Sequence, residues 1–365
     1  MTSRIKTILF IAFLLLLKVN LHAQNNELWT AFYNKDSTAV GFKDARQVVQ
    51  IEPKFNFNIQ ANYFRNIIAV VEHTQEGKWK SYYLTKAGKK VGQDSLHIFD
   101  NGFDCETEGF IRFKDHKHDK TGLFDKNGAV VIPATYNELS RVSNGMLIAL
   151  KGAEKKQSRD GEHYSWSGGQ ELLIDTNNTV LIENFAANSN LNFFSLQITD
   201  AVPIDFVRTS FLGTDGSYYS FIDYDKEFKQ WLENDLLNNL TIQKLVDTSN
   251  ETISWETADS WMKTDRQSFI TNNFKVLKRN LLEIKKPNAD YFIYNSGLNN
   301  FIFNEDSFKK YYNDCGESID NKYPTLSVVV SHGKKKRYTQ NNFEFLRTDE
   351  GYKLISVTIR NGRLK

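Results

Sequence analysis

The sequence predicts a mixed fold in which an all-β repeat array is followed by an α+β domain. A short self-similar segment recurs about every forty to fifty residues between residues 30 and 185, which is the sign of a repeat architecture. After about residue 190 the spacing of apolar residues changes from two to nearly four, as it does where helices begin. The expected divisions are a signal peptide (1–23), a β domain of about four units (24–190), a connection (191–220) and an α+β domain (221–365).

The first residues have the pattern of a secretory signal peptide. Arg4 and Lys6 precede an apolar run of eleven residues, Thr7–Leu17, which is too short for a membrane span of about twenty residues. Ala23 is a small residue where signal peptidase requires one, so we expect cleavage between Ala23 and Gln24; the alternative is an uncleaved N-terminal anchor. No cysteine lies near this point, so a lipoprotein is excluded. We expect a soluble protein of the periplasm or the cell exterior.

The charge balance argues against two classes of partner. The chain has 46 basic and 44 acidic side chains, and the leader holds three of the basic ones, so residues 24–365 carry 43 against 44. A nearly neutral chain has no electrostatic case for nucleic acid or an anionic membrane. We therefore expect neither as a partner, and no membrane insertion once the leader is removed.

The chain has only two cysteines, Cys105 and Cys315. So small a number indicates that the protein depends on ordinary apolar cores rather than on a disulfide framework. In an oxidising compartment the two can pair and join the two halves of the chain. Two separate, partly buried thiols are the simpler interpretation.

The best-preserved copy of the recurring segment is GLFDKNGAVVIPATY (Gly122–Tyr136). It aligns with GFKDARQVVQIEPKF (Gly41–Phe55), and weaker copies are YYLTKAGKKVG (Tyr82–Gly92) and LLIDTNNTVLIENF (Leu172–Phe185). Asn and Gly accept the positive φ of a tight turn, so each copy is expected to form a β-hairpin followed by further strands. A lone hairpin is barely stable in water, so the units must pack against one another.

This copy resembles the bacterial WG (KWG) repeat, and the resemblance extends over about residues 30–185. The matching positions are Gly122, Asp125, Gly128, Val131, Ile132, Pro133, Tyr136 and Gly145. The Trp-Gly that names the family is replaced by Thr121-Gly122, and the chain has no Trp-Gly elsewhere. The resemblance implies a β-rich array of exported or surface proteins that serves binding or scaffolding. It brings no catalytic motif.

Two amphipathic helices are expected in the C-terminal half. The first has an apolar face of Phe228, Trp231, Leu232, Leu236 and Leu240. The second begins at a capping box of Thr264 and Gln267 and ends before Pro287. Its apolar face consists of Ile270, Phe274, Leu277, Leu281 and Ile284.

Strands and one short helix are expected to complete this half. Short strands are predicted at Asp290–Tyr294 and Phe301–Phe303, and then a short helix from about Glu305 to Asn313, capped by Asn304. Three longer strands follow at Thr325–Ser331, Arg337–Arg347 and Tyr352–Ile359. The order helix–helix–β–β–helix–β–β–β indicates a curved antiparallel sheet wrapped on helices.

This order, with the closing FEFLRTDEGYKLISVTI, resembles the NTF2-like (cystatin-like cone) superfamily over about residues 205–365. The resemblance rests on the order of elements rather than on a motif. It implies a pocket between helices and sheet, which is an enzyme site in some members and a ligand or protein site in others. The fold alone therefore does not select a function.

A search for catalytic, phosphate-binding and metal-binding signatures finds none, and we expect no catalytic, cofactor or metal residues. KDHKHDK, with Asp115, His116, His118 and Asp119, can be a metal site or a polar loop, and its three lysines favour the loop. DNGFDCETE (residues 100–108) lacks the spacing of a calcium loop and is better explained by acidic turn residues. The basic run GKKKR (residues 333–337) is expected to be a solvated turn.

Aromatic residues make up 13% of the chain. Five of them are candidates for a sugar-binding platform, although aromatic residues in strands more often lie in the core. They are Trp79, Tyr82, Tyr83, Tyr164 and Trp166.

The sequence thus favours an exported, non-enzymatic binding or scaffold protein of the cell envelope. It would act through its β-repeat surface on an unidentified protein or glycan, without a cofactor. The alternative is a small-molecule-binding protein or an enzyme whose site lies in the pocket of the C-terminal domain. Convergent polar side chains in that interior would favour the alternative, and a filled apolar interior would argue against it.

Overall fold

The computed structural model describes residues 27–56, 59, 61–74, 76–99, 102–159, 164–186, 190–257, 260–333 and 338–365. The predicted signal peptide and its cleavage site lie outside this part of the chain. No helix in the described ranges is long and apolar enough to cross a membrane.

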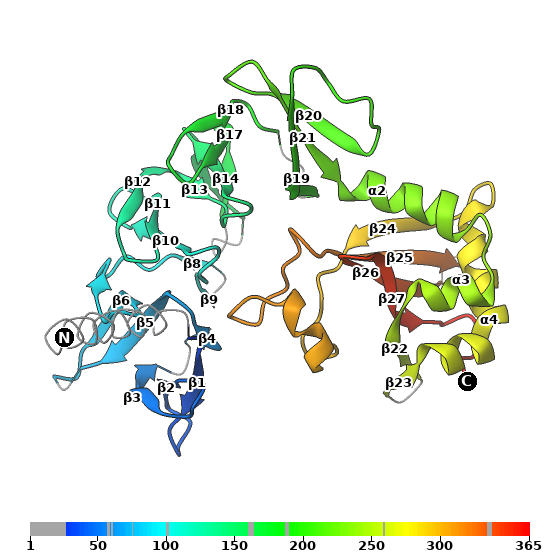
Figure 1. The fold of residues 1–365 in the computed structure, drawn as a ribbon, viewed down its shortest axis with the longest axis horizontal. Helices are drawn as coiled ribbons and strands as arrows, with labels where there is room; N and C mark the ends of the chain where they lie inside the picture. Colours follow the sequence, from blue (N-terminus) through cyan, green and yellow to red (C-terminus); the bar gives the residue numbers. More distant parts are fainter. Residues whose placement is uncertain are drawn as a thin grey trace, which may run out of the picture. The chain divides into compact units, whose positions relative to one another are not determined.

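The chain forms two compact units (Figure 1). Unit 1 is the chain up to Asn184 together with the short segment Asn313–Gly316. Unit 2 consists of Phe185–Tyr312 and Glu317–Lys365. The chain thus leaves unit 2 for four residues and then returns to it.

Unit 1 consists of antiparallel β-sheets. The largest is a seven-stranded half-barrel in the order β4-β1-β2-β3-β5-β6-β7. Its strands are β1 (Trp29–Tyr33), β2 (Ala39–Lys43), β3 (Val49–Asn56), β4 (Tyr63–Phe64), β5 (Ile67–His73), β6 (Trp79–Thr85) and β7 (Lys90–Val91).

The remaining sheets of unit 1 are smaller. They are β8 (Ile98–Phe99) with β9 (Gly102–Phe103); β10 (Phe110–Asp115), β11 (Lys120–Asp125) and β12 (Val130–Tyr136); β13 (Glu138–Leu139), β14 (Met146–Lys151), β17 (Gln170–Asp175) and β18 (Val180–Ile182); and β15 (Glu154–Gln157) with β16 (Tyr164–Ser167). Several apolar clusters, rather than one, fill the space between these sheets.

Three hairpins of unit 1 close with the same turn, namely β2–β3, β11–β12 and β17–β18. In each turn, Oδ1 of an aspartate accepts the backbone N–H groups of the residues two and four positions later, at 2.8–2.9 Å. The aspartates are Asp44, Asp125 and Asp175. A side-chain oxygen that satisfies two turn amides explains why Asp occupies this position in the self-similar segments.

Glycine begins two of these hairpins because the neighbouring strand passes very close. A Cβ atom at Gly41 would lie 2.4 Å from the carbonyl oxygen of Ile51. A Cβ atom at Gly122 would lie 2.5 Å from the ring of Phe113 and 2.7 Å from the carbonyl oxygen of Ile132. No side chain fits at these distances, so the glycines permit the bulged strand pairing seen at both sites.

Unit 2 begins with a three-stranded sheet in the order β19-β21-β20 and continues with a larger sheet and its helices. The first sheet comprises β19 (Leu191–Thr199), β20 (Arg208–Leu212) and β21 (Tyr218–Asp223). The helices are α2 (Tyr224–Gln230), the π-helical turn Trp231–Leu236, α3 (Ile242–Asp247), α4 (Arg266–Leu282) and the 3-10 turns Glu283–Lys285 and Asp306–Tyr311.

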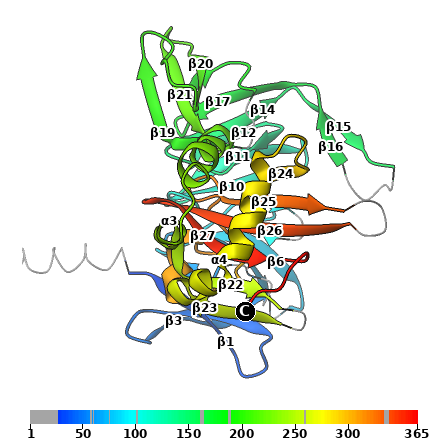
Figure 2. The same ribbon diagram turned by 90° about the vertical axis from the view of Figure 1, so that its right-hand side faces the viewer.

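The larger sheet is mixed and has the order β23-β22-β27-β26-β25-β24. Its strands are β22 (Ser249–Glu256), β23 (Trp261–Asp265), β24 (Tyr291–Asn295), β25 (Thr325–His332), β26 (Thr339–Thr348) and β27 (Gly351–Thr358). β22 and β27 are parallel, and the other neighbours are antiparallel. Helices α2, α3 and α4 cover one face of this sheet, as both views of the unit show (Figure 1, Figure 2). The 3-10 turn Asp306–Tyr311 packs against Leu346 and Ile355 on the other face.

Both amphipathic helices form where the apolar spacing predicts them. Phe228, Leu232 and Leu236 of the first are buried, as are Leu277 and Leu281 of the second. The N-cap of α4 is Asp265, whose side chain accepts the N–H of Ser268, and not the predicted Thr264. Thr264 is instead the last but one residue of β23.

Four expectations for the C-terminal half differ from the structure. The sheet, expected to be antiparallel, is mixed, because β22 pairs with β27 in parallel. The segment 191–220, expected as a connection, forms β19, β20 and the start of β21. Phe301–Phe303 is a turn rather than a strand, and the strand pair of the expected order is β22–β23, which precedes α4. The helix expected after Asn304 is the single 3-10 turn Asp306–Tyr311, which has no side-chain cap.

Candidate functional site

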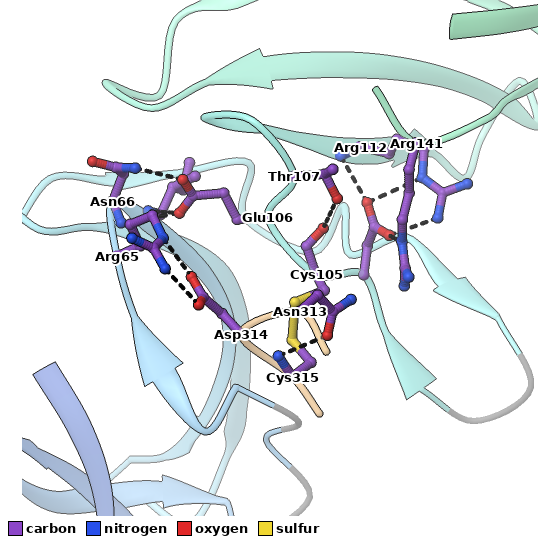
Figure 3. Close-up of a disulfide and its surroundings, with 12 residues drawn as sticks. Arg65, Asn66, Cys105, Glu106, Thr107, Arg112, Arg141, Asn313, Asp314 and Cys315 are labelled. Carbon is purple, nitrogen blue, oxygen red and sulfur yellow. Dashed lines mark hydrogen bonds and ion pairs between the residues drawn. A yellow bond between two sulfur atoms is a disulfide. The ribbon is translucent and has the colours of Figure 1, made fainter. Parts of the chain in front are cut away.

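The acidic segment around Cys105 is heavily cross-linked (Figure 3). Cys105 is buried and forms a disulfide with Cys315, with the two Cα atoms 6.2 Å apart. The cysteines therefore pair, and the interpretation as two separate thiols does not hold. Both belong to unit 1, because Cys315 lies in the segment Asn313–Gly316.

Asp314 provides a second attachment of this segment. Its carboxylate accepts hydrogen bonds from Nε and Nη2 of Arg65, each 2.8 Å long, in a bidentate pair. Its carbonyl oxygen accepts the N–H groups of Asn62 and Tyr63. Figure 3 shows Arg65 reaching Asp314 beside the disulfide, so covalent and ionic attachments lie next to each other.

Asp104, which precedes the cysteine, is buried between two arginines. Arg112 donates to both of its carboxylate oxygens at 2.6 and 3.0 Å, and Nε of Arg141 donates at 3.1 Å. Burial acts to raise the pKa of Asp104, but the charges and hydrogen bonds of the arginines prevail and hold the pKa well below its usual value. This carboxylate is ionised and fully committed to internal partners.

Glu106, which follows the cysteine, accepts the backbone N–H groups of Asn66 and Ile67, both at 2.9 Å. Burial raises the pKa of Glu106 in spite of these hydrogen bonds. Glu108 in turn accepts the N–H groups of Asn144 and Gly145. The carboxylates of residues 102–108 therefore all accept hydrogen bonds from the protein itself. These hydrogen bonds explain the acidic run without a calcium ion.

The loop with the two histidines does not assemble a metal site. Nδ1 of His118 pairs with Asp115 at 2.7 Å, whereas Asp119 is held by Lys114 and Lys155 at 2.9 and 2.6 Å. Across the described residues, no three His, Cys, Asp or Glu side chains are grouped so as to hold an ion. The other charged candidate, GKKKR, lies outside the described part of the chain except for Gly333.

The interior of unit 2 is filled by apolar side chains. One continuous cluster joins the helices to the inner face of the larger sheet, and Phe269, Leu277, Phe343 and Phe345 within it are fully buried. The buried Asn341 lies at the edge of this region, and its amide donates to Asn280 and Asn361 at 2.8 and 2.7 Å. The hydrogen bonds of this polar group are satisfied within the group.

Elsewhere in the unit, the carboxylate of Glu227 accepts hydrogen bonds from the hydroxyl of the buried Tyr352 at 2.7 Å and from Nε of Arg347 at 2.8 Å. Burial raises the pKa of Tyr352, and the three side chains are committed to one another.

The five candidate platform aromatics separate into three groups. Tyr82 and Tyr83 are buried in the core of unit 1. Trp79 is 59% exposed but packs alone against His73, with ring centroids 4.8 Å apart. Only Tyr164 and Trp166 lie together, with centroids 5.7 Å apart and ring planes at 81°.

Tyr164 and Trp166 occupy one face of the β15–β16 ribbon, which projects from β14 (Figure 2). In this ribbon Lys155 is paired with Trp166 and Gln157 with Tyr164. Directly opposed residues share a face, and so do residues two apart on one strand. The four side chains therefore lie on the same face, where Tyr164 is 48% exposed. We call this set, with Asp119 and Lys114 beside it, the ribbon face.

Lys155 is the central charge of the ribbon face. Its Nζ lies 4.0 Å from the ring centroid of Tyr164 and 5.2 Å from that of Trp166, in cation–π geometry. Burial acts to raise the pKa of Asp119, but hydrogen bonds from Lys155 and Lys114 hold that pKa below its usual value. The ionised Asp119 thereby joins the ribbon to the β10–β11 loop.

Sequence reasoning identified the two rings of the ribbon face but missed Lys155, Gln157 and the relation to Asp119. A signal exists in the sequence, because Lys155-x-Gln157 and Tyr164-x-Trp166 flank a polar stretch at equal spacing, as the two strands of a hairpin do. The contact with Asp119 depends on tertiary packing and leaves no such signal.

Five exposed apolar residues of unit 2 lie in and around the β19–β20 connection. Val202, Ile204 and Phe206 are all more than half exposed, and Ile204 has no neighbour that shields it. Ile198 and Leu212 on the adjoining strands are exposed as well. We call these five side chains the apolar loop.

The chain was also compared with protein-family models, with curated proteins and with solved structures, and none of them matches it.

Proposed function

We propose that the protein is an exported, non-enzymatic binding protein of the cell envelope that acts through the surface of unit 1, at the ribbon face. The observation that carries the proposal is an aromatic pair on a projecting two-stranded ribbon, in which Tyr164 is 48% exposed and Trp166 is half-buried. Such a ribbon is marginal alone, and a ring as exposed as that of Tyr164 adds little to a core, so its placement suits contact with a partner. The disulfide fits an oxidising compartment outside the cytoplasm.

The proposal includes the repeat character of unit 1. The recurrence of one Asp-closed turn in three hairpins, with glycine at the equivalent bulge of two of them, supports an array of related units like the WG repeat. In such an array the stacked units provide a rigid support, and loops or ribbons inserted between them provide the binding groups.

The packed interior of unit 2 favours surface binding over the alternative of a pocket. Helices covering one face of a curved, mixed sheet support the resemblance to the NTF2-like superfamily. The space in which members of that superfamily hold a ligand is here occupied by residues such as Phe343 and Leu277. We propose that unit 2 serves as a structural or docking domain.

The test is co-sedimentation of the purified protein with insoluble cell-envelope material. We expect binding by the wild type and at least a roughly tenfold loss of affinity in the double variant Tyr164→Ala/Trp166→Ala. Trp79→Ala is the control, because it removes an exposed ring elsewhere on unit 1. Equal binding by all three proteins, or none by the wild type, would refute the proposal.

A further inference from the structure

The chemistry of the ribbon face indicates the class of its ligand. We propose that this face binds an acidic polysaccharide, with sugar rings against Tyr164 and Trp166 and their carboxylate or sulfate groups on the neighbouring lysines. This inference rests on the proposed binding function and adds the ligand to it. Three observations support it, namely the local charge, the orientation of the rings and the position of Asp119.

The ribbon face is positive although the chain as a whole is neutral. Segments 114–120 and 151–167, which contain Lys114, Lys155 and the two rings, have seven basic and five acidic side chains. The rest of residues 24–365 therefore has 36 basic against 39 acidic side chains. A local excess of two positive charges on a slightly negative protein favours an anion at this place over the rest of the surface.

The orientation of the two rings suits sugars better than nucleic-acid bases. Successive bases stack in parallel on aromatic side chains, whereas Tyr164 and Trp166 stand at 81° to each other. The C–H groups of a pyranose ring carry slight positive charge and pack on the negative face of a single aromatic ring. Two rings in different planes can thus contact successive sugars of a twisted chain without stacking on each other.

Asp119 occupies the position that a ligand anion would take. Its carboxylate bridges Nζ of Lys114 and Nζ of Lys155, and it is 40% exposed. Lys155 also lies over both rings, so a sugar carboxylate reaching Lys155 must share it with Asp119. The internal carboxylate therefore acts as a competitor, and its removal is expected to strengthen the binding of anions.

The experiment compares polymers that differ only in charge. Protein expressed from the full-length sequence is titrated calorimetrically with polygalacturonate and with its fully methyl-esterified form. We expect a roughly tenfold preference for the free acid, lost at high salt and lost in Lys155→Ala. Asp119→Asn is expected to bind the acid several-fold more tightly, and Asp115→Asn, its neighbour with a histidine partner, to bind as the wild type does. Circular dichroism checks the fold of each variant.

Each other outcome overturns the inference in a recognisable way. Equal binding of the esterified polymer, with no effect of Asp119→Asn, would leave a neutral-sugar site and keep the proposed function. Tighter binding of poly-glutamate or of single-stranded DNA would assign the face to an acidic peptide or to nucleic acid. Absence of binding to any polysaccharide, while the envelope co-sedimentation still depends on Tyr164 and Trp166, would exclude the acidic polysaccharide and leave a protein partner.

Discussion

The two units are stabilised in different ways. Unit 2 has one large apolar cluster between helices and sheet and a smaller one on the opposite face of the sheet, whereas unit 1 divides its apolar residues among separate small clusters. Unit 1 compensates with specific cross-links, concentrated within three consecutive residues: Asp104 between two arginines, Cys105 in the disulfide and Glu106 on backbone amides. Short hairpins bury too little apolar surface to be stable without such links.

The difference in packing between the two units affects where each of them can place a binding site. A protein that builds its surface from hairpins can present a polar and aromatic ribbon such as β15–β16 without disturbing a central core. A unit whose main core is filled, as that of unit 2 is, has no room for a site there. We therefore expect substitutions in unit 1 to act through a few linking residues, and those in unit 2 to act through packing.

The largest effect is expected for Asp104→Asn. The substitution leaves Arg112 and Arg141 without their shared carboxylate, and breaking a buried ion pair costs about 3–5 kcal/mol. We expect the free energy of unfolding of unit 1 in urea to fall by this amount. Peptide-resolved hydrogen exchange measures the unfolding of this unit separately. Because the pKa of Asp104 is lowered in the folded state, its ionised carboxylate contributes its full stabilisation at a pH above the ordinary pKa near 3.8. This stabilisation is lost as the pH falls below that value. The difference from the wild type should therefore shrink in acid.

Asp36→Asn is the control for this prediction, since Asp36 is an exposed turn residue of the same unit. It should change the free energy of unfolding by less than about 0.5 kcal/mol. If Asp104→Asn proved equally mild, unit 1 would not depend on its ionic links, and the contrast between the two units would lose its main support.

The second effect concerns the disulfide. The variant Cys105→Ala/Cys315→Ala should destabilise unit 1 by about 2–5 kcal/mol, because it releases the segment Asn313–Gly316 from a long closed loop. A reductant should lower the stability of the wild type and leave the variant unchanged. Arg65→Ala removes only the half-exposed ionic attachment and should cost no more than about 1 kcal/mol. If Arg65→Ala destabilised unit 1 more than the double cysteine variant does, the ionic attachment and not the disulfide would be the stronger of the two.

The sequence predicted the features that depend on local chemistry. The Asp-Lys-Asn-Gly turn, the glycine at Gly122 and the apolar face of α4 each follow from near neighbours in the chain. The sheet of β19, β20 and β21 was missed, because "LNFFSLQIT" lacks the alternation that marks a strand. Of the candidate site, the two rings were identified, whereas the bridge from Asp119 to Lys155 depends on residues 36 positions apart that only the folded chain brings together.

A smaller effect, of opposite sign, is expected in unit 2 for Glu344→Gln. Glu344 lies between Phe343 and Phe345 and so points to the face of the sheet opposite the core, between Ser327 and Ser356. Burial raises the pKa of Glu344 in spite of hydrogen bonds from these serines and Asn342. Below the ordinary value of 4.5 the carboxyl is protonated in both the folded and the unfolded state, and the cost of ionising it grows as the pH rises through the folded-state pKa.

Glutamine should therefore stabilise unit 2 by about 1 kcal/mol at pH 8 and by nothing at pH 4. Its amide N–H groups can also donate to Oδ1 of Asn342, which is buried without a hydrogen-bond partner within the described residues. Thermal unfolding at the two pH values measures the difference. Destabilisation at pH 8 would mean that the ionised carboxylate is needed and that burial does not dominate at this position.

The smallest effect on stability, and a separate effect on association, is expected for the apolar loop. Val202, Ile204 and Phe206 are all more than half exposed, so replacing all three with serine should change the free energy of unfolding by less than about 0.5 kcal/mol. Exposed apolar groups of this size promote contact between molecules, so the variant should show weaker self-association in sedimentation velocity at high protein concentration. Binding to envelope material through the ribbon face should not change. A loss of several kcal/mol would instead show that the loop is packed in solution, and unit 2 would then depend on apolar contacts outside the clusters on its larger sheet.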